Sequence, residues 1–364
     1  MRFFLRFGFS FLCLISVNTF SWGFFAHQHI NRYAVFCLPP EMIPFFKKHI
    51  VYLTENAVNP DRRRYAVEGE AENHYIDIDI YGDSAVYKMP RKWEDAVAKY
   101  SEDTLRAYGI VPWHIVKVKK DLTWAFKNLD ANRILRIAAD LGHYIGDSNV
   151  PLHTTHNYNG QYTNQYGIHG FWESRLPELF SEKYDFFVGR AVYLKDPQQA
   201  AWEGVMQAHL ALDSVLKFEK ILTDRFGEDK KYGFETRNNL TVRVYSRDFS
   251  KAYHDMLNGQ VERQMTRAVH QTASFWYTCW VDAGKPDLSL LLDFKFDEEE
   301  LKKEREKWKK ETIKARPHDA AMLENDCHFF HNNCCGGDRM WKKMLTINPM
   351  LRELYDEHDN NHSH

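Results

Sequence analysis

The chain lacks an excess of basic charge, a long hydrophobic run in its body and any internal repeat. Its 48 Lys and Arg stand against 50 Asp and Glu, which gives a formal net charge of −2 at pH 7. This balance excludes a surface that binds nucleic acid by general charge alone. The apolar run at residues 7–17 is shorter than the roughly 20 residues that a membrane-spanning helix needs. We therefore expect no transmembrane segment in the mature chain.

Cysteine is also scarce, with six residues in the whole sequence. Cys13 lies in the N-terminal apolar run, and an odd number remains after it, so at least one thiol stays free or pairs between chains. Three of the others, with two histidines, lie in the stretch CHFFHNNCCGGD at residues 327–338. This stretch is either a further metal site or a disulfide-stapled loop, and we favour the loop in an exported protein.

The N-terminus has the pattern of a secretory signal peptide. Two arginines precede the apolar run, and the tripeptide TFS at residues 19–21 follows it, with small residues at −3 and −1 of a cut after Ser21. The sequence therefore predicts a secreted or periplasmic protein whose mature chain begins at Trp22. The new α-amine, with an ordinary pKa of about 7.7–8, is readily deprotonated by a metal ion.

One short window of the sequence, LGHYIGDSNVPLHTTHNYNGQYTNQYGIHGFWES, is rich in metal-binding side chains. It contains His143-x3-Asp147, then His153, then His169-x3-Glu173. In a helix, residues four apart share one face, so each pair can point both side chains at one ion. Imidazoles and carboxylates suit a borderline divalent metal such as zinc. Two such pairs with a histidine between them predict a metal centre.

Residues before this window extend the pattern in order along the chain. Those that carry it are Trp22, Gly23, His27, Asp61, His74, His143, Asp147, Pro151, Leu152, His153, His169 and Glu173. Over roughly residues 22–279, this set resembles the zinc-dependent phospholipase C / S1-P1 nuclease superfamily. The resemblance implies a secreted, all-α, multi-helix phospholipase C/P1 nuclease-like bundle with three zinc ions in a metal cleft.

The resemblance also implies a ligand set. The first zinc would take Asp61, His74, His143 and Asp147. The second zinc would take His153, His169 and Glu173, with positions left open for water. The third zinc would take the amine and carbonyl of Trp22, His27 and the second oxygen of Asp147. Asp61 and Asp79 are the expected catalytic carboxylates, with Asp79 beside the attacking water. Asp140, one turn before His143, is expected to orient the other ring nitrogen of His143.

Each of these residues also has an ordinary structural interpretation when it is taken alone. His27 fits an ordinary helix histidine, and Trp22 fits a core anchor. Asp61 follows Asn-Pro, which is a common turn signal. His169 and Glu173 fit an exposed ion pair on a helix. The joint occurrence of the whole set, in matching order, favours the metal centre over these separate explanations.

Such a centre predicts a hydrolase that acts on phosphoric ester bonds. Divalent ions lower the pKa of bound water, and two ions about 3.5–4 Å apart can hold the attacking and leaving oxygens at phosphorus. We slightly favour a nuclease on single-stranded nucleic acid, because the Trp22–His27 spacing resembles the nucleases. Tyr158, Tyr162 and Tyr166 could then stack on bases, although loop tyrosines also serve as packing residues.

The alternative substrate is a phospholipid. Glu173, where the nucleases tend to have Asp, and the short His153–His169 spacing resemble the phospholipase C branch. The same tyrosines could then hold a choline-like cation over their rings. A third hypothesis is a non-catalytic zinc-binding protein. The sequence leaves protein partners and oligomeric state open.

The rest of the sequence predicts helices nearly throughout. The expected helices span 27–36, 42–53, 92–108, 112–128, a helix opened by Asp130 that carries His143, one beginning at His169, and 197–226, 245–283 and 298–314. We expect residues 1–21 to be the signal peptide, residues 22–285 the zinc-dependent phosphoesterase domain, and residues 286–364 a charged helix followed by a Cys/His-rich tail.

Overall fold

A computed structural model describes residues 24–237 and 240–310 of the chain. The helices are α1 (Phe24–Ala34), α2 (Ile43–Lys48), α3 (Ile50–Glu55), α4 (Asn59–Arg63), α5 (Ala85–Lys88), α6 (Trp93–Tyr100), α7 (Glu102–Ala107), α8 (Val111–Lys127), α9 (Ala131–Ser148), α10 (Ile168–Gly170), α11 (Leu176–Phe180), α12 (Pro197–Phe226), α13 (Glu228–Lys231), α14 (Arg247–Met256), α15 (Gln260–Asp282) and α16 (Glu298–Lys310). The strands are β1 (Tyr232–Arg237) and β2 (Leu240–Tyr245). The predicted all-α fold class is confirmed.

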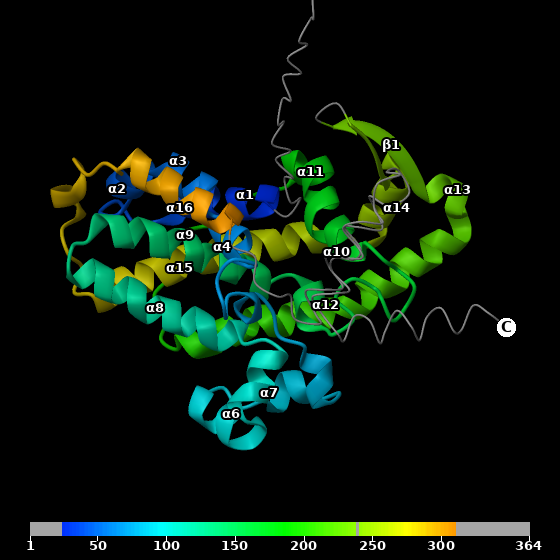
Figure 1. The fold of residues 1–364 in the computed structure, drawn as a ribbon, viewed down its shortest axis with the longest axis horizontal. Coiled ribbons are helices and arrows are strands. Elements are labelled where there is room, and N and C mark those ends of the chain that lie inside the picture. The colour runs from blue at the N-terminus through cyan, green and yellow to red at the C-terminus, as the bar shows by residue number, and fades with distance from the viewer. Residues whose placement is uncertain (1–23, 238–239, 311–364) are drawn as a thin grey trace, which may run out of the picture.

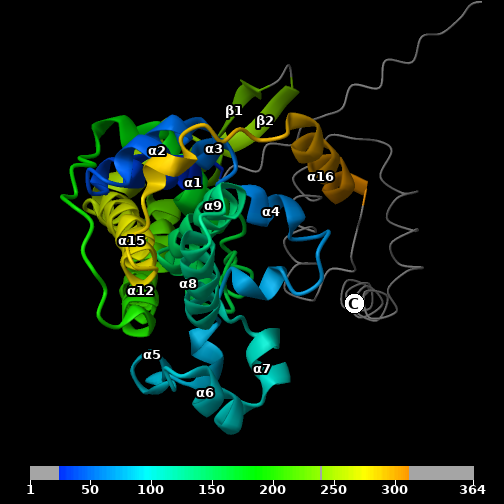
Figure 2. The ribbon, with the colours of Figure 1, turned by 90° about the vertical axis from the view of Figure 1, so that its left-hand side faces the viewer.

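Four long helices form the body of the molecule. In Figures 1 and 2, α8, α9, α12 and α15 run alongside one another, and α1 lies against α9 and α15. Large aromatic side chains such as Trp202, Trp276 and Phe126 are fully buried between these helices. The short helices α5, α6 and α7 project from one side as a separate group (Figure 2). The long helices therefore form the rigid frame on which side chains from distant parts of the sequence meet.

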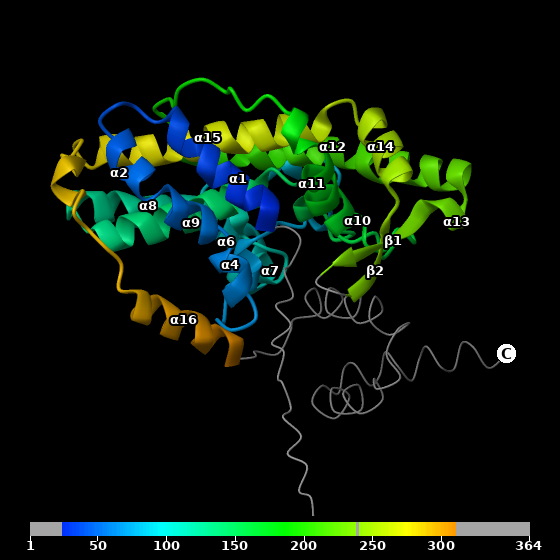
Figure 3. The same ribbon diagram turned by 90° about the horizontal axis from the view of Figure 1, so that it is seen from above.

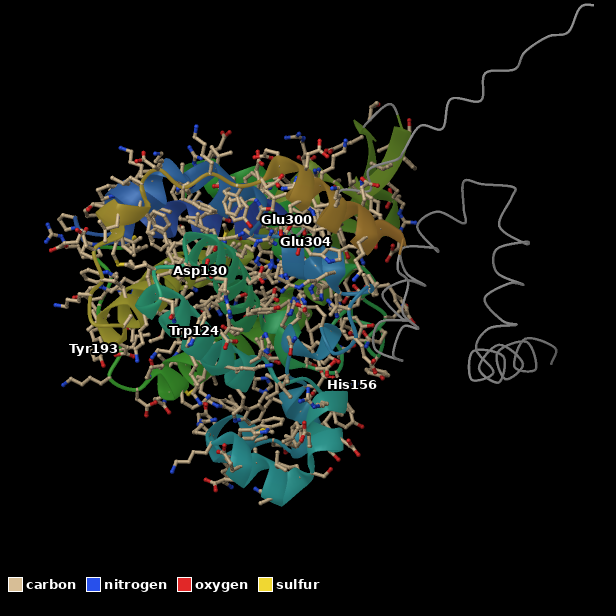
Figure 4. The ribbon with its side chains drawn as sticks, turned by 60° about the vertical axis from the view of Figure 1, so that its left-hand side comes forward. Trp124, Asp130, His156, Tyr193, Glu300 and Glu304 are labelled. Carbon is tan, nitrogen blue, oxygen red and sulfur yellow. The ribbon has the colours of Figure 1, made fainter. Side chains whose placement is uncertain are left out.

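Helix α9 begins where the sequence predicts. The Asp130 side chain accepts a hydrogen bond from the Arg133 backbone N–H at 3.0 Å, which caps the helix (Figure 4). A cap of this kind stabilises a helix by about 1 kcal/mol. Of the predicted apolar face, Ile134, Leu135, Ala138 and Leu141 are fully buried, whereas Ile137 is partly buried. This packing fixes the axis of the helix whose last two turns carry His143 and Asp147.

Several predicted helices are divided by residues with left-handed backbone. The helix expected over 92–108 is split at Ser101, whose φ is 67°. The helix expected over 245–283 is split at Asn258 and Gly259, with φ of 48° and 72°. Such a backbone interrupts right-handed helical geometry. The predicted single helices were therefore wrong at these points, whereas 197–226 matches α12 at both ends. The helix expected over 42–53 is also divided, into α2 and α3 at His49.

The hairpin of β1 and β2 is a further departure from the sequence prediction. The strands pair antiparallel with Tyr232 opposite Tyr245. Arg175 holds the hairpin through Glu235, with Arg175 Nη1 donating to Glu235 Oε2 at 3.0 Å. On β2 the apolar residues alternate with Thr241 and Arg243, which is the period of a half-buried strand.

The charged helix α16 packs on the molecule as an arm. Glu304 pairs with Arg136 of α9 at 2.5 Å, and the neighbouring Glu300 also faces Arg136 (Figure 4). Arg305 donates to the side-chain oxygen of Asn56 at 3.0 Å. The buried Leu301 anchors the first turn of the helix. The arm lies beside α4, as Figure 3 shows from above.

Some predictions fall on residues that the structure does not describe. These are the signal peptide at 1–21, the mature N-terminus at Trp22 and the Cys/His-rich stretch at 327–338. Within the described part of the chain, Cys37 and Cys279 are buried free thiols. No helix in that part combines the length and apolar character that a membrane crossing requires.

Candidate metal centre

Eight of the predicted ligands meet in the interior of the helical frame. They are His27 on α1, Asp61 on α4, His74 after a 3-10 turn, His143 and Asp147 in the last turns of α9, His153 in the turn that follows α9, His169 on α10, and Glu173 in the π-helical turn after α10. Their donor atoms form four groups of three, each group lying within 4.8 Å.

The first cluster is formed by Asp61, His74, His143 and Asp147. Asp147 Oδ2 lies 2.9 Å from His74 Nδ1 and 3.2 Å from His143 Nε2, and these two nitrogens are 3.0 Å apart. Asp61 Oδ1 lies 3.7 Å from His74 Nδ1 and 3.6 Å from His143 Nε2. Zinc bonds of 2.0–2.2 Å place tetrahedral ligand atoms about 3.3–3.6 Å apart. The five donor distances, 2.9 to 3.7 Å, lie around this range, so the four side chains are close enough to converge on one zinc ion.

The second cluster is a triangle of His153, His169 and Glu173. His153 Nε2 and His169 Nε2 are 3.1 Å apart, and Glu173 Oε2 lies 3.4 Å from the first and 2.7 Å from the second. Three protein ligands with the fourth position left for water are typical of a catalytic zinc site. This triangle therefore has the composition of a reactive site rather than of a closed structural one.

His27 forms the third cluster with the remaining oxygens of two shared carboxylates. Its Nε2 lies 3.3 Å from Asp147 Oδ1 and 3.4 Å from Glu173 Oε1. Asp147 thus faces the first and third clusters, as the resemblance implies. Glu173 faces the second and third, which the sequence analysis missed because spacing does not show where the second oxygen points. The predicted amine and carbonyl of Trp22 lie outside the described residues.

The chemistry of the cluster suits a divalent cation. The exposed fractions of His27, His74, His143, Asp147 and His153 lie between 0% and 6%. Imidazole nitrogens approach one another at 3.0 and 3.1 Å, which neutral or charged rings do not favour without a shared proton or cation. Nitrogen and carboxylate donors of this kind bind zinc. Because buried charges need a partner, a cation at their common centre satisfies the whole set.

Backbone carbonyls orient two of the rings. His143 Nδ1 lies 2.9 Å from Ala57 O, and His153 Nδ1 lies 2.6 Å from His74 O, so each ring directs its Nε2 at the clusters. The prediction that Asp140 orients His143 was wrong. The Asp140 carboxylate instead pairs with Arg63 at 2.9 Å, because the opposite side of the His143 ring faces the backbone that precedes α4.

Asp79 lies apart from the ligand clusters. Its exposed carboxylate accepts hydrogen bonds from Thr155 Oγ1 at 2.6 Å and from the His156 backbone N–H at 2.9 Å. Asp79 therefore holds the loop that follows His153. The catalytic role that the sequence analysis expects for Asp79 remains a prediction, whereas the structure brings Asp61, the other expected catalytic carboxylate, into the first cluster.

The loop after His153 also carries an ion pair that the sequence analysis missed. His156 Nδ1 lies 3.3 Å from the buried Asp77, and the Tyr162 hydroxyl lies 2.7 Å from His156 Nε2. Of the three tyrosines considered above, Tyr158 is buried, while Tyr162 is 66% and Tyr166 is 51% exposed. Two tyrosine rings near the site are thus open to a ligand.

The electrostatics of the metal-free cluster favour protons on some imidazoles. Burial opposes the charged form of His74, but the hydrogen bond to Asp147 and the nearby Glu70 carboxylate outweigh it and raise the pKa of His74 to about 9. Burial also opposes ionisation of Asp147, yet the neighbouring His143 and His153 hold the pKa of Asp147 well below its usual range. At neutral pH the metal-free site therefore has an ionised Asp147 beside a protonated His74.

Metal binding is therefore expected to release protons and to weaken as the pH falls. A metal binds the neutral imidazole, so below the His74 pKa of about 9 an ion in the first cluster must displace the proton of His74. For one displaced proton, the apparent affinity should fall about tenfold per pH unit. Zinc titration calorimetry in buffers of different ionisation enthalpy measures the protons released, and a value near zero at pH 7.5 would contradict this charge state.

The chain was compared with known families and structures. No family model and no curated protein matches it. Among solved structures, it is similar to the alpha-toxin of Clostridium perfringens from avian strain SWCP, with a TM-score of 0.42 and 12% sequence identity. The match covers 73% of this chain and 65% of the toxin chain. The chain therefore spans just under two thirds of that toxin's length.

Proposed function

We propose that this protein is a zinc-dependent hydrolase of phosphoric esters. The observation that supports the proposal best is the meeting of eight imidazole and carboxylate side chains at the separations of zinc ligands. Bound divalent ions supply a hydroxide nucleophile near neutral pH and stabilise negative charge on phosphoryl oxygens. In this proposal the centre holds three ions, and the third is completed by the amine of Trp22 after signal-peptide cleavage and export.

In this proposal, different residues of the chain have different roles. Asp147 and Glu173 each face two clusters and fix the spacing between them. The triangle of His153, His169 and Glu173 leaves room for a water or a substrate oxygen. Asp61, whose side chain is 23% exposed, is the ligand of the first cluster that solvent reaches. It is therefore placed to accept a proton from an attacking water.

Phospholipid is the substrate class that we favour. Glu173 in the ligand triangle is the feature that resembles the phospholipase C branch. The formal net charge of −2 provides no general attraction for a polyanion. In this function, water attacks the phosphorus and the bond to the glycerol oxygen breaks, so that the products are diacylglycerol and a phosphorylated head group.

Single-stranded nucleic acid is the second candidate substrate. It is favoured by the exposed rings of Tyr162 and Tyr166, because base stacking on aromatic rings is worth about 1–3 kcal/mol per base. A nuclease would cut the bond between phosphorus and a ribose or deoxyribose oxygen. The two candidates use the same metal centre and differ in what the surrounding loop holds.

A parallel assay separates these candidates. We expect mature, zinc-loaded protein to release phosphocholine from phosphatidylcholine in mixed micelles, and His169→Ala to lose this activity because the second cluster loses a ligand. His29→Ala is the matched control, since His29 contacts Phe25 O on the same helix as His27 and touches no cluster. Cleavage of single-stranded DNA or RNA without lipid hydrolysis would reverse the substrate order. Full zinc content without turnover on any substrate would support a binding protein instead.

A further inference from the structure

Glu70 lies behind the metal centre and is buried with an exposed fraction of 6%. Its Oε1 lies 3.6 Å from His74 Nε2, on the side of the ring that faces away from the first cluster. That nitrogen is buried and has no hydrogen-bond partner. The other ring nitrogen, Nδ1, faces Asp147, His143 and Asp61 at the distances given above. His74 is therefore held between a metal cluster and a carboxylate.

The Glu70 carboxylate is itself fixed by other side chains. Arg63 Nε donates to Glu70 Oε2 at 3.0 Å, and the Tyr144 hydroxyl donates to Glu70 Oε1. Arg63 also donates to the Tyr144 oxygen at 2.9 Å. These donors compensate the burial of the charged Glu70 carboxylate. They approach it from other directions, so the side that faces His74 Nε2 stays available to accept a hydrogen bond. The network therefore holds an acceptor at a fixed place behind the ring.

We propose that Glu70 is a positioning residue for the metal centre, which accepts a hydrogen bond from His74 Nε2–H and so keeps Nδ1 free of a proton and directed at the first cluster. This inference rests on the metal centre of the proposed function. A carboxylate that accepts from the remote nitrogen of a ligand histidine fixes its tautomer and raises its basicity as a ligand. The spacing Glu70-x3-His74 supplies it from the same chain segment.

The test is the zinc affinity of Glu70→Gln in the mature chain, measured by competition with a chromophoric chelator. Loss of a partner of this kind costs about 10–100-fold in metal affinity, so we expect at least a tenfold weaker binding of one ion, with full zinc content at saturation. The His74 Nε2–H resonance in proton NMR of the zinc-loaded protein should also shift and exchange faster with water. A loss of stability elsewhere that leaves the contact between residue 70 and His74 intact would not move that resonance.

Glu72→Gln is the matched control. Glu72 is equally buried, lies two positions away and pairs with Arg106 at 3.3 Å. We expect its zinc affinity and its His74 resonance to equal those of the unaltered protein. Should Glu70→Gln fail to fold, Glu70→Asp keeps the charge but withdraws the oxygen from His74, and it should show weaker zinc binding in the same direction.

The outcomes separate this inference from the proposed function. Unchanged zinc affinity and an unchanged His74 resonance in Glu70→Gln would overturn the role of Glu70, as would an equal loss in Glu72→Gln. Zinc binding that depends on Glu70 in a protein that hydrolyses no ester would overturn the proposed function alone. An unaltered protein that binds no zinc would overturn both.

Discussion

Replacing Asp147 by Asn is expected to remove at least two metal ions from each chain and to abolish hydrolysis. Its Oδ2 faces His74 and His143, while its Oδ1 faces His27 at 3.3 Å. Asn has nearly the same shape but offers one neutral oxygen and an NH2 group. That group would face an imidazole nitrogen or a cation in place of an acceptor. Because Asp147 is 1% exposed, water cannot replace the lost charge.

The loss of activity expected for Asp147→Asn exceeds the loss expected when a residue that only contacts a metal ligand is replaced. Outer partners of metal ligands contribute about 10–100-fold, so a carboxylate shared between two clusters should contribute more than about 100-fold to activity. Metal content per chain by elemental analysis and turnover on phosphatidylcholine measure the two effects. Asp130→Asn is the matched control on the same helix, since Asp130 caps the first turn of α9 and Asn is an equally good capping residue. Full metal content in Asp147→Asn would be incompatible with the proposed arrangement.

Substituting Gly146 by Ala is expected to displace His27 and empty the third cluster selectively. A Cβ at Gly146 would lie 2.8 Å from His27 Nδ1 and 3.0 Å from His27 Cε1, closer than side-chain atoms normally approach. The His27 ring stacks on His143 at 4.0 Å, so it has little room to retreat. Overpacking of this kind costs about 1–3 kcal/mol of folding stability. We expect one ion to be lost while two remain.

Gly142→Ala on the same helix is the control for Gly146→Ala. Its Cβ would lie 1.8 Å from Asn31 Oδ1, and the three atoms nearest to it belong to Asn31 and Thr272 rather than to a cluster residue. We expect its thermal unfolding temperature to fall while all its metal ions remain. Thermal melts with metal analysis distinguish the two variants. If both lost the same metal, the effect would come from distortion of α9 rather than from displacement of His27.

The meeting of the candidate ligand side chains could be predicted because local spacing carries much of their geometry. His143 and Asp147 lie one helical turn apart on α9, and His169 and Glu173 are likewise four positions apart. In the structure the two side chains of each pair approach each other: His143 Nε2 lies 3.2 Å from Asp147 Oδ2, and His169 Nε2 lies 2.7 Å from Glu173 Oε2. Helix α12 was predicted at both ends because Asp196 caps its first turn and Gly227, with φ of 76°, ends it.

Contacts between distant segments could not be predicted in the same way. The prediction for Asp140 followed helical spacing, but the position of Ala57 beside His143 is set by how α9 packs on the segment before α4. Glu70 has the same x3 spacing from its histidine, and the sequence analysis passed it over. It lies outside any long helix, where such spacing does not imply a shared face.

The chain order of the metal ligands has a consequence for biosynthesis. His27 leaves the ribosome first and Glu173 much later, yet the two side chains meet in the third cluster, where His27 Nε2 lies 3.4 Å from Glu173 Oε1. A nascent or translocating chain therefore presents only fragments of the cage. If the chain is the lipid hydrolase proposed above, ion capture and damage to the producer's own lipids would be deferred until the helices have docked into one finished molecule.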